Sequence, residues 1–413
     1  MALLFKKLLD RILLNSIREG RFRVIWPDGS QTLYGNGASP AAGIKILNAA
    51  TLRRLVLNPG LALGEGYMEE TILPLDGSIH DVLALLLDSM ASHPMPILQW
   101  NERISRLLRP ILQANNARRA KRNVAHHYDL NGRLYSLFLD RDRQYSCAYF
   151  PRGDETLEEA QAAKKRHIAA KLLLNRPGLT VLDIGCGWGG MALTLARDFG
   201  ARVTGITLSE EQLTEARARA AAAGLEERVK FELMDYRAMD RPFDRIVSVG
   251  MFEHVGVPNF ASFFATISRC LKADGVALLH SIGRFEGPGA TNRWIAKYIF
   301  PGGYSPALSE ALVPLEKSGL ITTDIEILRL HYAKTIAHWR ARFAAHRNTI
   351  ATLYDERFCR MFEFYLSGSE LSFRLSDHMN FQIQIAHNHA TVPLSRDYMF
   401  DQERQIALPR AAE

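Results

Sequence analysis

The sequence contains little cysteine. The four cysteines in its 413 residues are Cys147, Cys186, Cys270 and Cys359, and none of them forms a C-x-x-C pair. Such wide spacing argues against a zinc site or any other metal site, and against a disulfide framework. A reducing, cytoplasmic setting is the simplest interpretation.

Long hydrophobic runs are absent as well. No apolar run approaches the roughly 20 residues that a membrane-spanning helix needs. The charged residues Lys6, Lys7, Asp10 and Arg11 interrupt the apolar start of the chain, which argues against a signal peptide. Any membrane contact is therefore expected to be peripheral, on the inner membrane face. The formal net charge of +7 fits an anionic surface, although many enzymes carry such an excess without that partner.

Length and composition predict a globular protein of two or three domains. Hydrophobic residues make up 47% and charged residues 23% of the chain, as is typical of globular proteins. The expected order is a small N-terminal α+β domain over 1–92, a basic linker over 93–123, a catalytic domain over 124–395 and a C-terminal tail over 396–413.

The N-terminal domain is expected to begin with an amphipathic helix over 3–18. Leu4, Leu8 and Ile12 share one face of it. A basic amphipathic helix either lies on an anionic membrane or packs on its own domain. We therefore expect this domain to serve lipid docking or dimerisation. Residues 60–68 are interpreted as a glycine-punctuated segment between two helices.

The basic linker allows two interpretations. Residues 99–123 carry many arginines and lysines against one acid, Glu102. Such a segment either holds phospholipid headgroups or is a solvated connector. Nucleic acid is disfavoured as a partner because the run lacks aromatic residues for base stacking.

The most informative stretch reads L-D-I-G-C-G-W-G-G over 182–190. A buried strand over 180–184 is predicted to turn through glycines into a helix that begins near Met191. Glycine allows the tight turn and the close approach of a ligand, and the new helix N-terminus adds unpaired N–H groups beside it. A glycine-rich connector without a ligand is the structural alternative.

Two features favour S-adenosylmethionine (SAM) over a dinucleotide at this turn. Gly185, Gly187 and Gly190 fit the dinucleotide pattern G-x-G-x-x-G. The glycines are preceded by an acid, however, and the pattern D-x-G-x-G-x-G is made by Asp183, Gly185, Gly187 and Gly189. The next strand is followed by Thr207, where a dinucleotide-binding fold would place an acid for the ribose.

Alternating strands and helices follow the glycine turn. Strands are predicted at 202–206, 228–233, 245–250, 275–280, 324–330 and 371–385. The pattern indicates an α/β fold, a doubly wound, seven-stranded Rossmann-like SAM-methyltransferase core. Asp235 and Tyr236 follow the third strand, Glu253 follows the fourth and His280 ends the fifth. Ligands bind at the carboxyl ends of such strands, so Asp235 is well placed for the adenine amine.

Several segments together resemble the cyclopropane-fatty-acyl-phospholipid synthase family, which includes enzymes like the mycolic acid cyclopropane synthases. The matching stretches are Tyr128-Asp129, Y-S-C-A-Y-F (145–150), T-L-E-E-A-Q (156–161), L-D-I-G-C-G-W-G-G (182–190), T-L-S-E-E-Q (207–212), F-E-H-V-G (252–256), L-H-S-I-G (279–283), Tyr332 and Y-L-S-G-S-E-L-S-F-R (365–374). Many relatives have cysteine where this chain has Ser369, so that position receives no role.

This resemblance implies methylene transfer from SAM to a cis double bond of an unsaturated phospholipid acyl chain. Together with the glycine pattern it implies SAM contacts from Tyr145, Ser146, Asp183, Gly185, Gly187, Gly189, Thr207, Ser209, Gln212, Asp235 and Tyr236. It also implies a bicarbonate ion held by Cys147, Glu253, His280 and Tyr332. Each of these four could instead be structural. Glu253 could cap the next segment, His280 could be a hydrogen-bonded core histidine, Cys147 a small buried residue and Tyr332 a packing residue.

The chemistry explains why such residues are needed. Methyl transfer to an alkene leaves a carbocation, so water must be excluded and a base must take a proton before the ring closes. Bound bicarbonate would be a base of suitable strength, and negative charge stabilises the cation. The rings of Phe252 and Tyr149 could add cation–π support.

Two other functions compete with this one. The first is a SAM-dependent methyltransferase that makes methyl-branched fatty acyl chains or methylates a small amine. The second is a lipid-surface protein with an inactive cofactor fold. The expected partners are unsaturated phospholipid, an anionic membrane surface and a second copy of the chain in a homodimer.

Overall fold

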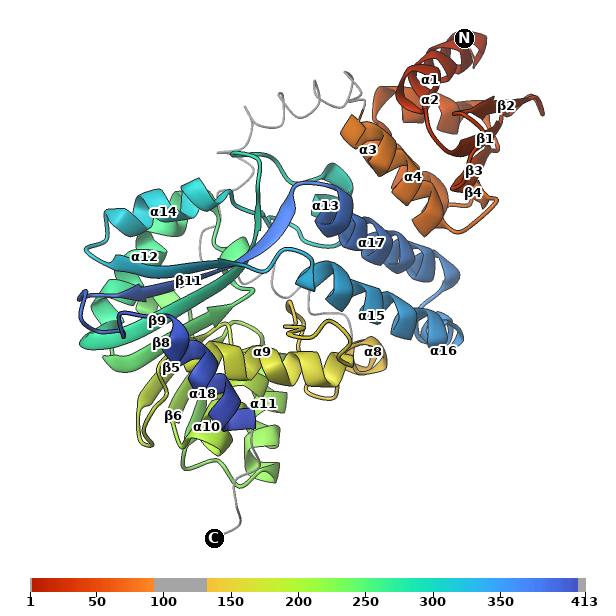
Figure 1. The fold of residues 1–413 in the computed structure, drawn as a ribbon. Helices are drawn as coiled ribbons and strands as arrows, with labels where there is room; N and C mark the ends of the chain where they lie inside the picture. Colours follow the sequence, from red (N-terminus) through yellow and green to blue (C-terminus); the bar gives the residue numbers. More distant parts are fainter. Residues whose placement is uncertain (1, 93–131, 408–413) are drawn as a thin grey trace. The chain divides into compact units, whose positions relative to one another are not determined.

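The computed structural model describes residues 2–92 and 132–407, which fall into two compact units (Figure 1). The first unit combines residues 2–92 with Gly289–Pro301 and Ile336–His378, and the second contains the other described residues. The domain boundaries expected near 92, 123 and 395 stay predictions. The basic linker and the pair Tyr128-Asp129 lie outside the described residues.

The first unit is a small four-stranded sheet with helices. Its strands are β1 (Arg21–Ile25), β2 (Gln31–Tyr34), β3 (Ala41–Ile46) and β4 (Ile72–Leu75), in the order β2-β1-β3-β4. Its helices are α1 (Ala2–Ser16), α2 (Ala49–Leu57), α3 (Pro59–Met68), α4 (Ile79–Ser92), α13 (Arg293–Tyr298), α16 (Arg347–Leu353), α17 (Glu356–Leu375) and the part of α15 (His331–Ala345) that begins at Ile336. Phe22, Val24 and Trp26 from β1 and its end lie in the core of this unit.

Residues 60–68 form most of helix α3, so the glycine-punctuated segment is helical. A Cβ atom on Gly64 would lie 2.5 Å from the Trp294 indole nitrogen, and one on Gly66 would lie 2.4 Å from Ile72 Cδ1. These glycines let α3 pack closely inside the first unit. The close packing offsets the cost of about 1 kcal/mol that glycine carries in a helix.

Helix α1 packs on its own unit with a face other than the one that carries Leu4 and Leu8. Leu13 and Ile17 are buried in the core of the first unit, and Phe5 and Leu9 pack against them. The leucines of the predicted face point outward: Leu4 is 66% and Leu8 is 44% exposed.

The second unit holds a seven-stranded sheet in the order β10-β11-β9-β8-β5-β6-β7, which confirms the predicted fold class. The strands are β5 (Thr180–Ile184), β6 (Arg202–Thr207), β7 (Val229–Leu233), β8 (Phe243–Val249), β9 (Leu271–Arg284), β10 (Ile321–Ile327) and β11 (His378–Ala386). Strand β5 pairs in parallel with β6 and β8, β6 with β7, and β8 with β9, whereas β10 and β11 are antiparallel.

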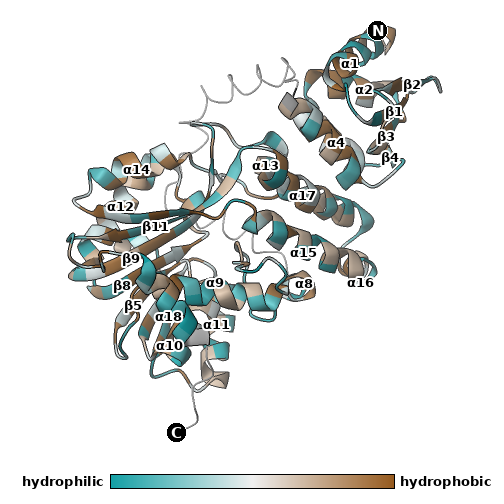
Figure 2. Ribbon diagram, in the orientation of Figure 1, coloured by the Kyte–Doolittle hydropathy of each residue, from teal (hydrophilic) through white to brown (hydrophobic). Residues whose placement is uncertain are grey.

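Two layers of helices cover this sheet. The helices are α8 (Gly132–Phe138), α9 (Leu157–Lys171), α10 (Gly190–Phe199), α11 (Glu210–Ala222), α12 (Phe260–Cys270), α14 (Leu308–Glu316) and α18 (Asp397–Ala407). Residues of α12 and α14 form one hydrophobic cluster with the sheet, and residues of α9, α10 and α11 form another. Strands β8 and β9 between these layers carry hydrophobic residues along much of their length (Figure 2).

The last predicted strand begins later than the sequence indicates. Residues 371–375 end helix α17, and strand β11 begins at His378. The motif T-L-E-E-A-Q starts α9 as predicted, where Thr156 and Glu159 form a capping box. Within the described part of the chain, every helix is too short or too polar to cross a bilayer.

Candidate active site

The carboxyl edge of the large sheet collects the predicted site residues. Asp183 lies at the end of β5, Thr207 ends β6, and Asp235 follows β7. Glu253 follows β8, and His280 in β9 lies opposite Val249, the last residue of β8. Parallel strands deliver these side chains to one edge, which is where α/β sheets bind ligands.

The glycine turn after β5 combines tight packing with open space. Gly185, Gly187 and Gly189 have φ values of +81°, +52° and +83°, which favour glycine. A Cβ on Gly185 would lie 2.8 Å from Met251, and one on Gly189 would lie 2.7 Å from the Phe231 ring. A Cβ on Gly187 would meet no atom of the described residues within 4 Å. The space in front of Gly187 is therefore open among the described residues.

Asp183 lies buried under this turn. One carboxylate oxygen, Oδ2, has no hydrogen-bond partner within residues 2–92 and 132–407. Burial raises the pKa of the Asp183 carboxyl to about 7, against the opposing charge of Lys164. An unpaired buried oxygen is costly, so a ligand that donates a hydrogen bond to it would be stabilised.

The residues after β6 that are predicted to contact SAM form hydrogen bonds with one another. The Thr207 hydroxyl donates to Gln212 Oε1 at 2.9 Å. Ser209 caps helix α11, because its Oγ accepts from the Gln212 amide at 3.2 Å. The structure thus gives Ser209 a local role that is independent of a cofactor.

The acid after β7 is paired in the same way. The Asp235 carboxylate accepts from the Arg237 guanidinium at 2.5 and 2.8 Å. The Tyr236 ring meets Phe263 edge-on at 5.5 Å. Asp235 is consequently held in place by Arg237, and its predicted contact with adenine stays a prediction.

The segment 145–150 is fixed by helices α9 and α15. Lys164 Nζ donates to the Ser146 hydroxyl at 2.9 Å. The amide of Ala148 donates to Thr335 Oγ1 at 3.0 Å, and the amide of Phe150 donates to His331 Nδ1 at 2.9 Å. Cys147, between these anchors, is fully buried.

Tyr332 and Tyr145 are placed by the same elements. Tyr332 lies in the first turn of α15, between the two anchoring residues, and it is 7% exposed. Tyr145 meets Tyr135 of α8 edge-on at 5.4 Å.

Burial raises the pKa of the Cys147 thiol above its ordinary value, so this cysteine is a neutral thiol at neutral pH.

Glu253 and His280 each present one unsatisfied atom. Glu253 Oε1 accepts from the Ile282 amide at 2.7 Å, and His280 Nδ1 lies 3.0 Å from Gln382 Nε2. Glu253 Oε2 and His280 Nε2 are buried without a hydrogen-bond partner among the described residues. Burial raises the pKa of the Glu253 carboxyl to about 7 and holds that of the His280 imidazole well below 6.5.

Four polar residues of this region are missing from the sequence-based prediction: Gln161, Lys164, Lys171 and Gln382. All are 1% exposed or less. Burial lowers the pKa of the Lys164 ammonium to about 8. Helical spacing could have indicated the buried position of these lysines, since Lys164, His167 and Lys171 share one face of α9. The run Lys164-Lys165-Arg166 hides it, because consecutive cations are typical of a solvated surface.

The aromatic rings predicted to support a cation are engaged elsewhere. Phe252 is fully buried and stacks on Phe260 with 4.1 Å between ring centroids. Tyr149 stacks on His167 at 4.2 Å and on His331 at 5.1 Å. The ring of Phe252 thus lies in an aromatic core, and its support of a cation stays a prediction.

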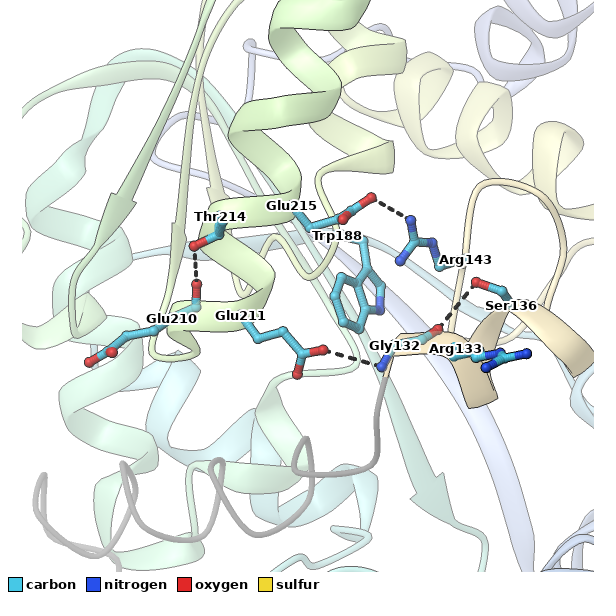
Figure 3. A pocket seen from close by; sticks show the side chains of 9 residues that line it. All are labelled: Gly132, Arg133, Ser136, Arg143, Trp188, Glu210, Glu211, Thr214 and Glu215. Atoms are coloured by element: carbon cyan, nitrogen blue, oxygen red, sulfur yellow. Dashed lines mark hydrogen bonds and ion pairs between the residues drawn. The ribbon is translucent and has the colours of Figure 1, made fainter. Parts of the chain in front are cut away.

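A hollow lies between α8 and α11 and reaches Trp188 of the glycine turn. Its volume is about 540 Å³, and Figure 3 shows the side chains that line it. Arg143 pairs with Glu215 there, and its guanidinium lies 5.1 Å from the Trp188 ring centroid. The amide of Gly132 donates to Glu211 at 3.2 Å. Arg143 and Glu215 thus neutralise each other within this lining.

Comparison with known proteins decides the family. The sequence model described as mycolic acid cyclopropane synthetase matches residues 115–383. The chain belongs to this family. A second model, described as a domain of unknown function, matches residues 8–95. The predicted resemblance is confirmed, and the chain is a SAM-dependent enzyme of the mycolic acid cyclopropane synthetase family.

Individual relatives extend this match. The chain is 38% identical to the cyclopropane-fatty-acyl-phospholipid synthase of Escherichia coli over 350 residues, covering 84% of this chain and 88% of the relative. It is 34% identical to the tuberculostearic acid methyltransferase of Mycobacterium tuberculosis over 378 residues, covering 88% and 87%.

A solved relative supports the cofactor. The crystal structure of mycolic acid cyclopropane synthase CmaA1 complexed with SAH and CTAB has a TM-score of 0.61 and 35% identity to this chain, covering 64% of this chain and 97% of that one. SAH is the product that SAM leaves after methyl transfer. The comparison therefore agrees with the glycine turn in assigning SAM to this family.

Proposed function

We propose that this protein transfers a methylene group from SAM to the cis double bond of unsaturated phospholipid acyl chains and forms a cyclopropane ring. The observation that carries the proposal is the pair of buried, unsatisfied atoms Glu253 Oε2 and His280 Nε2, at the sheet edge that also bears the glycine turn. Homology to the Escherichia coli enzyme named for this reaction supports the substrate class.

A bicarbonate ion fits the donors and acceptors of this pair. Bicarbonate has oxygens that accept a hydrogen bond from an imidazole N–H and one O–H group that donates to a carboxylate. Cys147 and Tyr332 would complete the set of ligands. When bound, the ion supplies a base for a proton of the transferred methyl group.

The residues of the chain also protect the carbocation. Glu253 and His280 are 8% and 1% exposed, and Cys147 is fully buried. Burial keeps water from capturing the cation as an alcohol. With a pKa of about 7, the Glu253 carboxyl is partly ionised at neutral pH, so it brings negative charge to a region where positive charge develops.

A methyl-branched product is the second candidate. The Mycobacterium tuberculosis relative is named a tuberculostearic acid methyltransferase, and the alignment covers 88% of this chain. Both reactions begin with the same methyl transfer. They diverge at the carbocation. In one reaction it loses a proton from the new methyl group and closes a ring, and in the other the new methyl group stays intact as a branch.

The deciding experiment uses SAM with a fully deuterated methyl group and vesicles of cis-unsaturated phosphatidylglycerol. Mass spectrometry and proton NMR of the acyl products distinguish the reactions. Two retained deuteriums with ring signals establish cyclopropane formation. Three retained deuteriums establish simple methylation and contradict the proposal. No labelled lipid, despite measured SAM binding, redirects the search to small amines.

We further propose that the protein acts at an anionic membrane surface through the outer face of α1. Leu3, Leu4, Leu8 and Leu14 are 63%, 66%, 44% and 63% exposed, and Lys7 and Arg11 are exposed too. At 100° per residue the two cations lie between these leucines on one face. Each near-surface cation adds roughly 1 kcal/mol on an anionic leaflet.

Vesicle sedimentation tests this face. Replacing both Leu4 and Leu8 by Ser should abolish binding of the full chain to phosphatidylglycerol vesicles, and neutral phosphatidylcholine vesicles should bind weakly. Leu33→Ser is the matched control, since Leu33 of β2 is 64% exposed and lies outside α1. If the Leu4 and Leu8 variant binds vesicles like the wild type but light scattering shows that it has lost a dimer, the face serves self-association instead.

A further inference from the structure

A chain of three buried side chains runs from α9 through β11 to β9. Lys171 Nζ donates to Gln382 Oε1 at 2.7 Å, and Gln382 Nε2 lies 3.0 Å from His280 Nδ1. All three residues belong to the second unit and are 1% exposed. Lys171 is held in turn by an ion pair with Glu326.

The order of donors along this chain fixes the state of the histidine. A lysine ammonium group only donates, so the oxygen of the Gln382 amide must face Lys171. The NH₂ group of the same amide must then face His280 and donate to Nδ1. Because Nδ1 accepts, it carries no hydrogen, and in a neutral imidazole the hydrogen lies on Nε2. His280 Nε2 is the buried atom without a partner among the described residues.

Burial and the surrounding charges keep the imidazole neutral. Burial is the largest influence on the pKa of His280, and Lys164, Lys171 and His167 of α9 lower it further, whereas Glu326 of β10 opposes them. A protonated ring would also put an N–H group at Nδ1 against the donating amide of Gln382. Both effects disfavour the imidazolium form.

We propose that Lys171 and Gln382 are positioning residues that hold His280 as the Nε2–H tautomer, so that His280 donates a hydrogen bond to the bound anion. This inference rests on the proposed function for the identity of the anion. It excludes His280 as the base that takes the proton from the new methyl group. The ring nitrogen without a hydrogen, Nδ1, already accepts a hydrogen bond from Gln382. The same tautomer also makes the carboxylate of Glu253 and the imidazole of His280 complementary: one accepts and the other donates.

The tautomer can be observed without any turnover. Wild-type protein labelled with ¹⁵N-histidine and a His280→Gln variant are compared by NMR, and the difference gives the two ring nitrogens of His280. A nitrogen without hydrogen at Nδ1 and an N–H at Nε2 are expected. The opposite assignment overturns the inference, whether or not the wild-type protein makes cyclopropane lipid.

Substitutions at Gln382 then test the role in catalysis. Gln382→Met removes the donor to Nδ1 and should raise the KM for bicarbonate at least 10-fold while SAM affinity changes less than 3-fold. Gln382→Glu offers a carboxylate that pairs with a protonated ring. This variant should be active at low pH and should lose activity as pH rises through the new pKa of His280, whereas the wild type should show no such loss as pH rises.

The matched control lies in the same strand. Gln384 is buried two residues further along β11 and hydrogen-bonds the Lys171 carbonyl and the Tyr398 hydroxyl, away from His280. Gln384→Met should keep the wild-type KM for bicarbonate and the wild-type pH profile. Equal effects of the two methionine substitutions, with a wild-type profile for Gln382→Glu, would reduce Gln382 to a packing residue and refute the proposal.

Discussion

Replacing Gly187 by alanine separates ligand binding from folding at the glycine turn. Its φ of +52° gives an L-residue a conformational cost of about 1–2 kcal/mol. Its new Cβ would meet no described atom within 4 Å. We therefore expect a fall in the midpoint of thermal unfolding of roughly 2–4 °C per kcal/mol for a unit of this size, together with a loss of SAM affinity of at least about 10-fold, or 1.4 kcal/mol.

Gly224→Ala is the control for the conformational cost. Gly224 has a φ of +64°, and a Cβ there also meets no described atom within 4 Å. It lies two residues after the end of α11, in the connection to β7 and away from the sheet edge that bears Glu253 and His280. This variant should lose a similar amount of stability and keep wild-type SAM affinity.

Gly189→Ala is the control for packing. Its Cβ would lie 2.7 Å from the Phe231 ring and 3.1 Å from Ala216 Cβ, so overpacking adds about 1–3 kcal/mol to the conformational cost. Isothermal titration with SAM and thermal unfolding of all three variants provide the data. Wild-type SAM affinity in Gly187→Ala would refute the reasoning, because the open space before Gly187 would then not be the cofactor site.

Three further predictions follow from buried groups. Glu253→Gln should lower turnover at least about 100-fold while SAM affinity, measured by titration, stays within 3-fold; parallel loss of both would indicate a structural role. Phe252→Ala should destabilise the protein by about 3–5 kcal/mol in urea unfolding, since a fully buried ring is removed; a change below 1 kcal/mol would contradict its core position. Burial would raise the pKa of Glu326, yet hydrogen bonds and charge from His167 and Lys171 hold it well below 4.5. Burial would lower the pKa of His167, but its bonds to Glu326 and Glu403 raise it above 6.5. The contribution of Glu326 is thus present above pH 4.5 and lost in acid, and that of His167 is present below pH 6.5 and lost as pH rises through its folded pKa. Unfolding midpoints measured against pH should show both slopes, and His167→Gln should abolish the one above pH 6.5.

Local patterns made the catalytic core predictable. The glycine turn, the strands before and after it and the capping box at Thr156 each depend on a few neighbouring residues. Parallel strands then placed Glu253 and His280 at one edge without any knowledge of side-chain contacts. These two positions could be predicted because a strand end is visible in the sequence.

Period-based reasoning failed where packing decided the outcome. The alternation L-S-F-R-L over 371–375 resembles a strand, but helix α17 continues through it and buries Leu371 in the first unit. In α3, glycines indicated a connector, whereas the Trp294 ring against Gly64 requires them in a helix. Neither contact partner is near in sequence, so a window of neighbouring residues does not contain the deciding information.

Long-range pairing also explains why the polar support of the site escaped prediction. Lys171 and Gln382 are separated by 211 positions, and each alone resembles an ordinary surface residue. In the folded chain, Lys164, His167 and Lys171 of α9 all lower the pKa of His280, and Lys164 also acts on Cys147. Positive charge near that edge favours an anion over a metal cation there. Burial and these cations make it costly to protonate His280, so in the mechanism proposed above the anion, and not the histidine, removes the proton.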